Sequence, residues 1–195
     1  LGSDLVSENA RDHLERVFGG QVFEEQDWND GDLFLLVSGH PLFGPDGKIA
    51  EQAKLHITPT EVSEWNIAPG DGVAVFDTPR GRIAMLTCYD IEFPEIVRMV
   101  RAKGVDVIFC PSCTDDLHGF YRVRYCCHAR TIENQIYVVT TGTVGSLPTV
   151  DFMRANTGQA AIISPNDVPF PPRGLVAEGQ LNNDMIVTAD MHLAL

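Results

Sequence analysis

A cysteine at position 88 is the residue of this chain best placed to do chemistry. It lies where an apolar strand ending near Thr87 runs into a helix that opens at Pro94. A thiol at such a turn is held exposed at a sheet edge, and a helix N-terminus lowers its pKa below about 8.5. The backbone N–H groups of Tyr89 and Asp90 could receive a developing oxyanion there. The segment indicates a thiol nucleophile for acyl chemistry, and the alternative is a small buried hydrophobic residue.

A lysine and a glutamate seven residues apart form a second candidate pair. Lys54 closes a strand that leaves the turn at residues 44–47, and Glu61 follows it. Near a thiolate, the ammonium group would stabilise both the thiolate and a tetrahedral oxyanion. Glu61 would orient Lys54 and shuttle a proton. The alternatives are a solvated strand-edge lysine and a loop carboxylate, because most such groups are exposed.

Two further cysteines, Cys110 and Cys113, have CxxC spacing. A thioredoxin-like redox motif lies at a helix start after a strand, and this pair does follow a strand. A zinc site would need a second pair of ligands, and His118 and His128 are not suitably paired. We favour a structural or substrate-loop role for the CxxC segment, and we expect neither a metal site nor a cofactor.

Polar residues also follow the buried strand at residues 105–110. Thr114 and Asp115 are candidate substrate-pocket residues, because ligands collect beyond the carboxyl ends of strands in layered α/β folds. The next predicted helix carries four charged residues, namely Arg122, Arg124, Arg130 and Glu133. We interpret these four as ion-paired structure rather than as substrate anchors.

Chain length, net charge and cysteine content limit the class of protein to which this chain can belong. A chain of 195 residues is about one domain, and its net charge of −13 argues against a nucleic-acid partner and against an anionic membrane surface. No apolar run reaches the roughly 18 residues of a membrane helix, and we see no signal peptide. Five cysteines, an odd number clustered in one third of the chain, favour reduced thiols in a cytoplasmic protein. The first residue is Leu1, so a processed chain or a fragment is one expectation.

Strand and helix patterns alternate through the middle of the chain. Helices are predicted at residues 7–18, 94–104 and 120–133. Strands are predicted at residues 21–25, 32–38, up to about 55, 72–76, 82–87, 105–110, 136–141, 159–164 and 185–189. This order predicts a layered α/β fold with a mixed sheet.

Three segments resemble signatures of the nitrilase superfamily, the carbon–nitrogen hydrolases. One segment, Cys88-Tyr89-Asp90-x-Glu92-Phe93-Pro94-Glu95, resembles the family's nucleophile signature. A second, Lys54-Leu55-His56-x-Thr58-Pro59-x-Glu61, resembles its lysine signature. The later helix-to-strand signature resembles Ala129-Arg130-x-Ile132-Glu133-Asn134-x-x-Tyr137-Val138. All three stand in the family's order, and the resemblance runs from about Gly19 to the C-terminus. Further segments, such as Thr114-Asp115-Asp116 and Val144-Gly145-Ser146-Leu147-Pro148, resemble the branch whose members often carry an N-terminal acetyltransferase domain.

The resemblance implies a four-layer αββα sandwich that forms homodimers or higher homo-oligomers, and a Cys-Glu-Lys mechanism that hydrolyses a small amide without a cofactor. By position, it makes Cys88 the nucleophile and Lys54 the oxyanion lysine. The Tyr89 N–H becomes an oxyanion donor, and Glu61 becomes a second, supporting glutamate.

The sequence departs from this family at its beginning. The general-base glutamate normally lies on an early strand upstream of the region matched by Gly19, and neither Glu8 nor Glu15 has that setting. We therefore expect a single hydrolase domain over residues 1–195 that is truncated at its N-terminus. The alternatives are a truncated or degenerate non-catalytic member acting only in association, and a CxxC thiol redox protein.

Overall fold

The structure is a computed structural model that describes residues 36–44, 47–149 and 154–193. Its backbone divides into two compact units, Leu1–Asp71 and Gly72–Leu195, and each is described by itself. The helix predicted at residues 7–18 and the strand predicted at residues 21–25 lie outside the described residues. The prediction of one domain over residues 1–195 therefore stays a prediction.

The described part of the first unit is built from short strands and one helix. Strand β1 (Leu36–Val37) pairs in parallel with β4 (Ile67–Ala68), and β2 (Gly39–Gly44) forms an antiparallel hairpin with β3 (Gly47–Ala53). The hairpin confirms the turn expected at residues 44–47. Helix α2 (Pro59–Ser63) follows β3 and begins with proline, which suits a first helical position.

A six-stranded mixed sheet organises the second unit. Its strands are β5 (Phe76–Thr78), β6 (Gly81–Met85), β7 (Val107–Ser112), β8 (Tyr137–Gly142), β9 (Ala161–Ile163) and β10 (Leu175–Glu178). Their spatial order is β10-β9-β8-β7-β6-β5, and β6, β7 and β8 are parallel to one another. The predicted α/β class with a mixed sheet is confirmed. The carboxyl ends of the parallel strands meet at one edge, where ligands collect in such folds.

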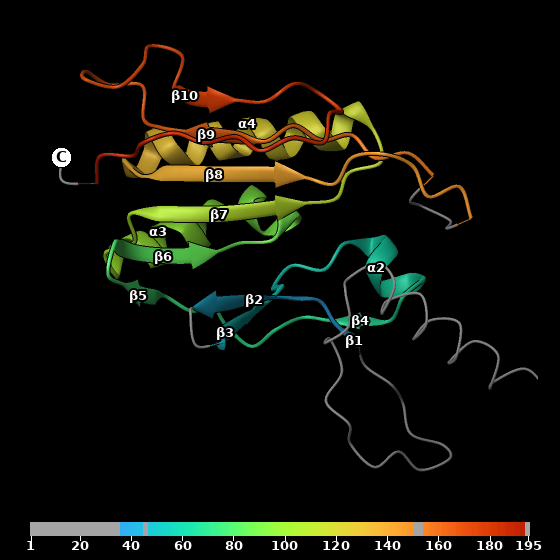
Figure 1. The fold of residues 1–195 in the computed structure, drawn as a ribbon. Helices are drawn as coiled ribbons and strands as arrows, with labels where there is room; N and C mark the ends of the chain where they lie inside the picture. Colours follow the sequence, from blue (N-terminus) through green and yellow to red (C-terminus); the bar gives the residue numbers. More distant parts are fainter. Residues whose placement is uncertain (1–35, 45–46, 150–153, 194–195) are drawn as a thin grey trace, which may run out of the picture. The chain divides into compact units, whose positions relative to one another are not determined.

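The two faces of this sheet are covered differently. Helices α3 (Pro94–Ala102) and α4 (Leu117–Asn134) lie on one face, and the chain after β10 crosses the other (Figure 1). On that second face, Met191 and Leu193 pack against a cluster centred on Val107, Tyr137 and Ile162. Residues of β7 alternate between the faces. Ile108 and Cys110 are fully buried on one face, whereas Phe109 on the other is 36% exposed, so the burial on both faces that the apolar run indicated holds for only part of the strand.

The strand predicted at residues 185–189 is wrong, and β10 takes its place at the sheet edge. The pattern at residues 185–189 alternates because Met185 and Val187 pack against the backbone of Gly179, where an added Cβ would lie 3.0 and 3.1 Å from their side chains. Strand β10 was missed because it is only four residues long and follows a proline-rich loop. Short edge strands depend on a partner that lies elsewhere in the sequence.

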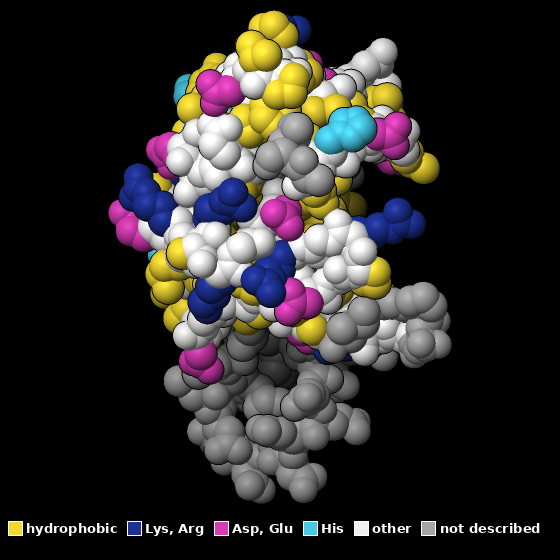
Figure 2. Space-filling view, turned by 90° about the vertical axis from the view of Figure 1, so that its left-hand side faces the viewer, with side chains coloured by type: hydrophobic (Ala, Val, Ile, Leu, Met, Phe, Trp, Pro, Cys, Tyr) yellow, Lys and Arg dark blue, Asp and Glu magenta, His cyan; other side chains and the backbone are white. Residues whose placement is uncertain are grey.

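Basic and acidic side chains lie side by side on the end of this unit at the left of Figure 1, as Figure 2 shows. Arg82 is paired with Asp77, and Arg101 lies 3.8 Å from Asp106. The ion pair with Asp77 raises the pKa of the Arg82 guanidinium. Among the described residues, the basic side chains seen on this face therefore lie beside acidic ones. Within the described ranges, no helix has the length and apolarity needed to cross a bilayer.

The close approach of two glycines predicts a stability effect. A Cβ on Gly158 would lie 2.8 Å from backbone atoms of Gly142 and Thr143. We expect Gly158→Ala to lower the free energy of unfolding by about 1–3 kcal/mol, because backbone cannot yield as a side chain can. Urea unfolding measures this loss. Gly72→Ala is the matched control, since nothing lies within 4 Å of its Cβ position, and equal stability of the two variants would contradict the prediction.

Candidate active site

Cys88 begins a single 3-10 turn, η1 (Cys88–Glu92), directly beyond the carboxyl end of β6. Its φ is +49°, in the left-handed region that residues other than glycine rarely adopt. Such a conformation costs on the order of 1–3 kcal/mol and persists where the surroundings impose it, which is common at functional sites. The side chain is half-buried. The sharp strand-to-helix turn predicted for Cys88 is therefore present.

A buried carboxylate holds the inside of this turn. Asp90 is 1% exposed, and its Oδ2 accepts a hydrogen bond of 3.0 Å from the Thr87 N–H. The Asp90 N–H in turn donates to the Thr87 carbonyl at 3.0 Å. Residues 87 and 90 thus form a reciprocal cap that closes the turn around Cys88.

Arg130 of α4 holds the outside of the same turn. Its Nε donates to the Ile91 carbonyl and its Nη2 to the Glu92 carbonyl, both at 3.0 Å. The Glu133 carboxylate lies 3.0 Å from Nη1, so the side chain is both buried and neutralised. The interpretation of Arg130 and Glu133 as ion-paired structure agrees with these contacts. The role of Arg130 is to fix the end of the turn that begins with Cys88.

The predicted oxyanion donors differ in their bonding. The Asp90 N–H is committed to the Thr87 carbonyl, so the expectation that it receives the oxyanion is corrected. The Tyr89 N–H remains the predicted donor. The ring of Tyr89 meets that of Phe93 edge to face at 5.1 Å, which packs the turn against the start of α3.

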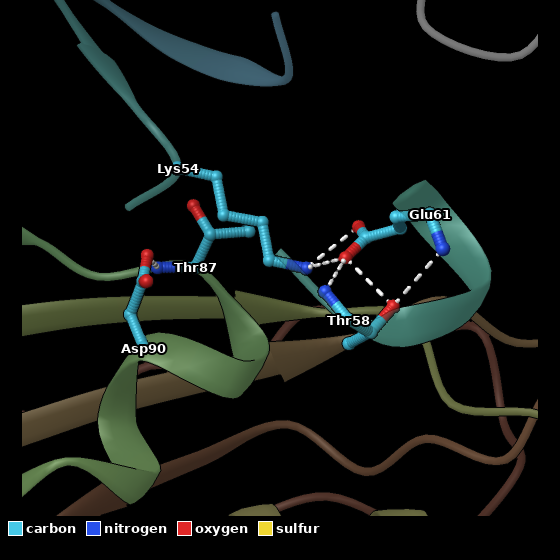
Figure 3. Close-up of polar contacts among 5 residues, drawn as sticks. All are labelled: Lys54, Thr58, Glu61, Thr87 and Asp90. Atoms are coloured by element: carbon cyan, nitrogen blue, oxygen red, sulfur yellow. Dashed lines mark hydrogen bonds and ion pairs between the residues drawn. The ribbon is translucent and has the colours of Figure 1, made fainter. Parts of the chain in front are cut away.

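Lys54 and Glu61 form a buried ion pair within the first unit. The Lys54 Nζ lies 2.6 and 2.7 Å from the two carboxylate oxygens of Glu61 (Figure 3). The side chains are only 4% and 14% exposed, so the solvated strand-edge alternative for Lys54 is wrong. The Lys54 backbone is fixed as well, because its N–H donates to the Ser38 carbonyl at 2.7 Å.

Thr58 completes this arrangement through a capping box at the start of α2. Its N–H and its hydroxyl both donate to Glu61 Oε2 at 2.8 Å, and its Oγ1 accepts from the Glu61 N–H at 3.3 Å. Both oxygens of Glu61 are therefore hydrogen-bonded. A carboxylate bound in this way suits holding a lysine better than taking a proton from a thiol.

Thr114 and Asp115 take different positions in the loop after β7. Thr114 is 7% exposed, and its hydroxyl donates to the Thr157 carbonyl at 2.7 Å. Asp115 is exposed. The Thr114 hydroxyl therefore ties this loop to the chain before β9. The role of these two residues in binding substrate stays a prediction.

The two cysteines of the CxxC segment are poorly arranged for redox chemistry. Cys110 lies within β7 and is fully buried, whereas Cys113 lies beyond the strand and is exposed. Three extended residues span about 10 Å, and a disulfide requires Cα atoms within roughly 7 Å. The pKa of the Cys110 thiol is raised by its hydrogen bond to Cys127 and by burial, so Cys110 is a poor nucleophile. In the described part of the chain, no group of three or more His, Cys, Asp or Glu side chains could hold a metal ion.

Sequence reasoning missed the supports of these candidates rather than the candidates themselves. Thr58 and Glu61, like Thr87 and Asp90, stand three residues apart in the polar–x–x–acid spacing of a capping box. That spacing could have identified both caps. The contact of Arg130 with η1 joins residues 38 and 39 positions apart, and nothing local signals it.

The whole chain matches a known family. The model of the carbon-nitrogen hydrolase family matches residues 4–194. A probable hydrolase of Bacillus subtilis strain 168, YhcX, is 45% identical over 98% of this chain and 36% of its own length. The human omega-amidase NIT2 is 28% identical over 69% of this chain and 50% of its own length. The chain thus spans between about a third and a half of the length of these relatives.

Solved structures of nitrilase-superfamily proteins have the same fold. The chain resembles Nit3 of Saccharomyces cerevisiae, a member of branch 10 of that superfamily, with a TM-score of 0.64 and 23% identity over 78% of this chain and 52% of that one. It resembles the Caenorhabditis elegans NitFhit protein with a TM-score of 0.60 and 27% identity over 74% of this chain and 35% of that one. The predicted nitrilase-type α/β fold is confirmed, and the chain belongs to the carbon-nitrogen hydrolase family.

Proposed function

We propose that the protein hydrolyses the carbon–nitrogen bond of a small amide through a thioester on Cys88. The observation that carries the proposal is the left-handed backbone of Cys88, held by Asp90 and Arg130 at the carboxyl end of β6. A non-glycine residue kept in this conformation by two buried polar groups indicates a site whose orientation matters. Membership of the carbon-nitrogen hydrolase family gives the reaction class.

The reaction proceeds in two covalent steps. The Cys88 thiolate attacks the amide carbon, and the negative charge moves to the carbonyl oxygen. The C–N bond then breaks, and the amine leaves with a proton while the acyl group stays on sulfur. Water attacks the thioester carbon, the C–S bond breaks, and the carboxylic acid is released with regeneration of the thiol.

Lys54 and Glu61 have supporting roles in this proposal. The ammonium group of Lys54 stabilises the oxyanion together with the Tyr89 N–H. Glu61 orients Lys54, because both of its oxygens accept hydrogen bonds from the Lys54 ammonium group and Oε2 also accepts one from the Thr58 N–H. A different glutamate acts as the general base, as the family resemblance implies.

The names of the relatives support an amide as substrate. The omega-amidases of Xenopus laevis and Bos taurus are each 29% identical to this chain over about 70% of its length and half of theirs. A deaminated glutathione amidase of Yersinia enterocolitica is 29% identical over 57% of this chain. The names of these proteins share a reaction, the hydrolysis of an amide, but they do not share a substrate. The proposal is therefore limited to small amides as a class.

Removal of the nucleophile gives the first test. In the full-length protein, Cys88→Ala should lower amide turnover by about 10⁴-fold or more, because no other group can form the thioester. Ammonia release from an amide panel measures turnover. Cys113→Ala removes an exposed thiol and should leave turnover unchanged. Equal turnover by Cys88→Ala and wild type would refute the proposal. If Cys113→Ala or Cys110→Ser abolished activity while Cys88→Ala did not, the protein would instead be a thiol redox protein.

Separation of the buried ion pair gives the second test. Glu61→Gln leaves the Lys54 charge without its partner, so we expect the free energy of unfolding to fall by about 3–5 kcal/mol. The double variant Lys54→Met with Glu61→Met should lose less stability than Glu61→Gln, but its loss of amide turnover should be as large as that of Glu61→Gln. Urea unfolding and initial rates measure the two effects. The control is Glu51→Gln, which breaks an exposed pair with Lys48 and should cost less than about 1 kcal/mol. A Glu61→Gln variant as stable as Glu51→Gln would contradict the burial argument.

Loosening the Cys88 turn gives the third test. Arg130→Lys keeps the positive charge but cannot donate to both carbonyls of η1 from a planar fork. We expect the alkylation rate of Cys88 by iodoacetamide to fall by about tenfold, because small misplacements of a reacting group cost up to about 10²-fold. The pH profile of alkylation should shift as well, which a general loss of stability would not cause. Arg122→Lys is the control, since Arg122 is exposed and hydrogen-bonds the Glu92 side chain rather than the backbone carbonyls of η1, and lysine keeps its positive charge. Identical profiles for the two variants would rule out a positioning role for Arg130.

A further inference from the structure

A buried thiol in the second unit contacts the backbone of the candidate nucleophile. Cys110 of β7 is fully buried, and the turn η1 packs against β7. The Cys110 sulfur accepts a hydrogen bond from the Cys88 N–H on one side and is hydrogen-bonded to the thiol of Cys127 on the other. Cys110 therefore links the start of η1 to helix α4, although it lies far from both in the sequence.

The register of the sheet explains how Cys110 reaches this position. Strands β6 and β7 are parallel, Met85 lies opposite Phe109, and the Leu86 N–H donates to the Phe109 carbonyl at 2.9 Å. Leu86 and Cys110 are thus the next positions along the two strands, and Cys88 follows two residues later, where β6 has ended. The hydrogen bond to a thiol of α4 places the Cys110 side chain on the helix-covered face of the sheet, next to the turn.

The surroundings of Cys110 hold it in one place. Thr140 lies opposite it on β8, and the Thr140 hydroxyl donates to the Cys110 carbonyl at 3.2 Å. The backbone is thus fixed by β8 and the sulfur by Cys127. The hydrogen bond to Cys127 and burial both raise the pKa of the Cys110 thiol, which therefore stays neutral. A neutral thiol does not oppose the ionisation of Cys88, as a second thiolate would.

The sulfur of Cys110 satisfies a donor that the turn directs inward. Because its acceptor is fully buried, the Cys88 N–H points into the protein rather than into solvent. A backbone N–H removed from water destabilises the fold unless it finds an acceptor. Cys88 already has a strained φ of +49°, so the contact with Cys110 stabilises a conformation that is unfavourable by itself.

The successive N–H groups of the turn then have separate tasks. The Cys88 N–H is bound by the Cys110 sulfur, and the Asp90 N–H is bound by the Thr87 carbonyl. These two bonds leave the Tyr89 N–H as the predicted oxyanion donor. Without the first bond, the peptide before Cys88 could rotate, and the directions of the thiol and of the Tyr89 N–H would change together.

We propose that Cys110 is a positioning residue for the thiol of Cys88. Its sulfur holds the Cys88 N–H inward, so that the Cys88 thiol and the Tyr89 N–H stay directed at one amide group. The inference rests on the function proposed for Cys88 and adds to it a role for β7 in aligning the nucleophile. Cys110 itself touches no reacting atom and forms no bond in the reaction.

Three variants of the full-length protein test the proposal. Cys110→Ala removes the acceptor, whereas Cys110→Ser replaces the sulfur by an oxygen that can accept the same hydrogen bond. Ile108→Val is the control, because it removes one carbon from a fully buried residue on the same face of β7.

We expect Cys110→Ala to lower kcat for an amide by about tenfold with KM changed by less than about twofold, because a misplaced nucleophile slows the chemical step. Cys110→Ser should recover at least about a third of the wild-type kcat, and Ile108→Val should stay within about twofold of wild type. If Cys110→Ala does not fold, Cys110→Val takes its place, since valine has no acceptor but fills the space of the sulfur.

Two further readouts need no turnover. In protein labelled with ¹⁵N at cysteine, the Cys88 amide signal is identified by its loss in Cys88→Ala. This amide proton should shift upfield in Cys110→Ala but not in Ile108→Val. The alkylation rate of Cys88 by iodoacetamide, followed on its own peptide by mass spectrometry, should fall about tenfold in Cys110→Ala. Both readouts decide the role of Cys110 even if Cys88→Ala protein keeps full turnover and the proposed function fails.

Three results would each overturn the proposal. The first is a Cys88 amide signal that Cys110→Ala does not move. The second is an equal alkylation rate in Cys110→Ala and Ile108→Val, since Cys110 would then only fill space. The third is a Cys110→Ser variant no more active than Cys110→Ala, because the acceptor would then have no effect.

Discussion

The left-handed backbone of Cys88 is the constraint to which the rest of the second unit conforms. Its cost, on the order of 1–3 kcal/mol, is offset only because Asp90 closes the turn from inside and Arg130 holds its far end. Arg130 can reach η1 only if α4 lies against the sheet. The turn at Cys88, helix α4 and the parallel strands therefore depend on one another. The thiol is oriented by contacts with residues far from it in the sequence.

The same principle governs the first unit on a smaller scale. Lys54 and Glu61 are both removed from water, which is unfavourable unless every charge is matched. The capping box of α2 supplies the matching, since Thr58 donates twice to the carboxylate that binds Lys54. A buried pair of this kind adds little stability over apolar residues of similar volume, which agrees with the role proposed for the ammonium group.

Arg124 and Arg130 show how one helix contacts two different parts of the second unit. The two residues are six positions apart on α4 and face different neighbours. Arg130 has its donors satisfied by η1 and Glu133, whereas Arg124 shares only Glu178 and keeps an unsatisfied Nη1. The two side chains are equally buried and equally charged, so they differ in how fully their donors are satisfied.

Local pattern determined much of this protein: the α/β class, helices α3 and α4, the central strands, the turn around Cys88 and the residues of the Lys54 pair. These features rest on spacing, turn chemistry and apolar runs within a few residues, and sequence carries that information directly. Only the tertiary structure decided the left-handed φ of Cys88, the burial of Lys54, the commitment of the Asp90 N–H, and β10 in place of residues 185–189. Each of these depends on contacts between distant residues, because burial and edge-strand pairing are properties of the packed chain and not of any short segment.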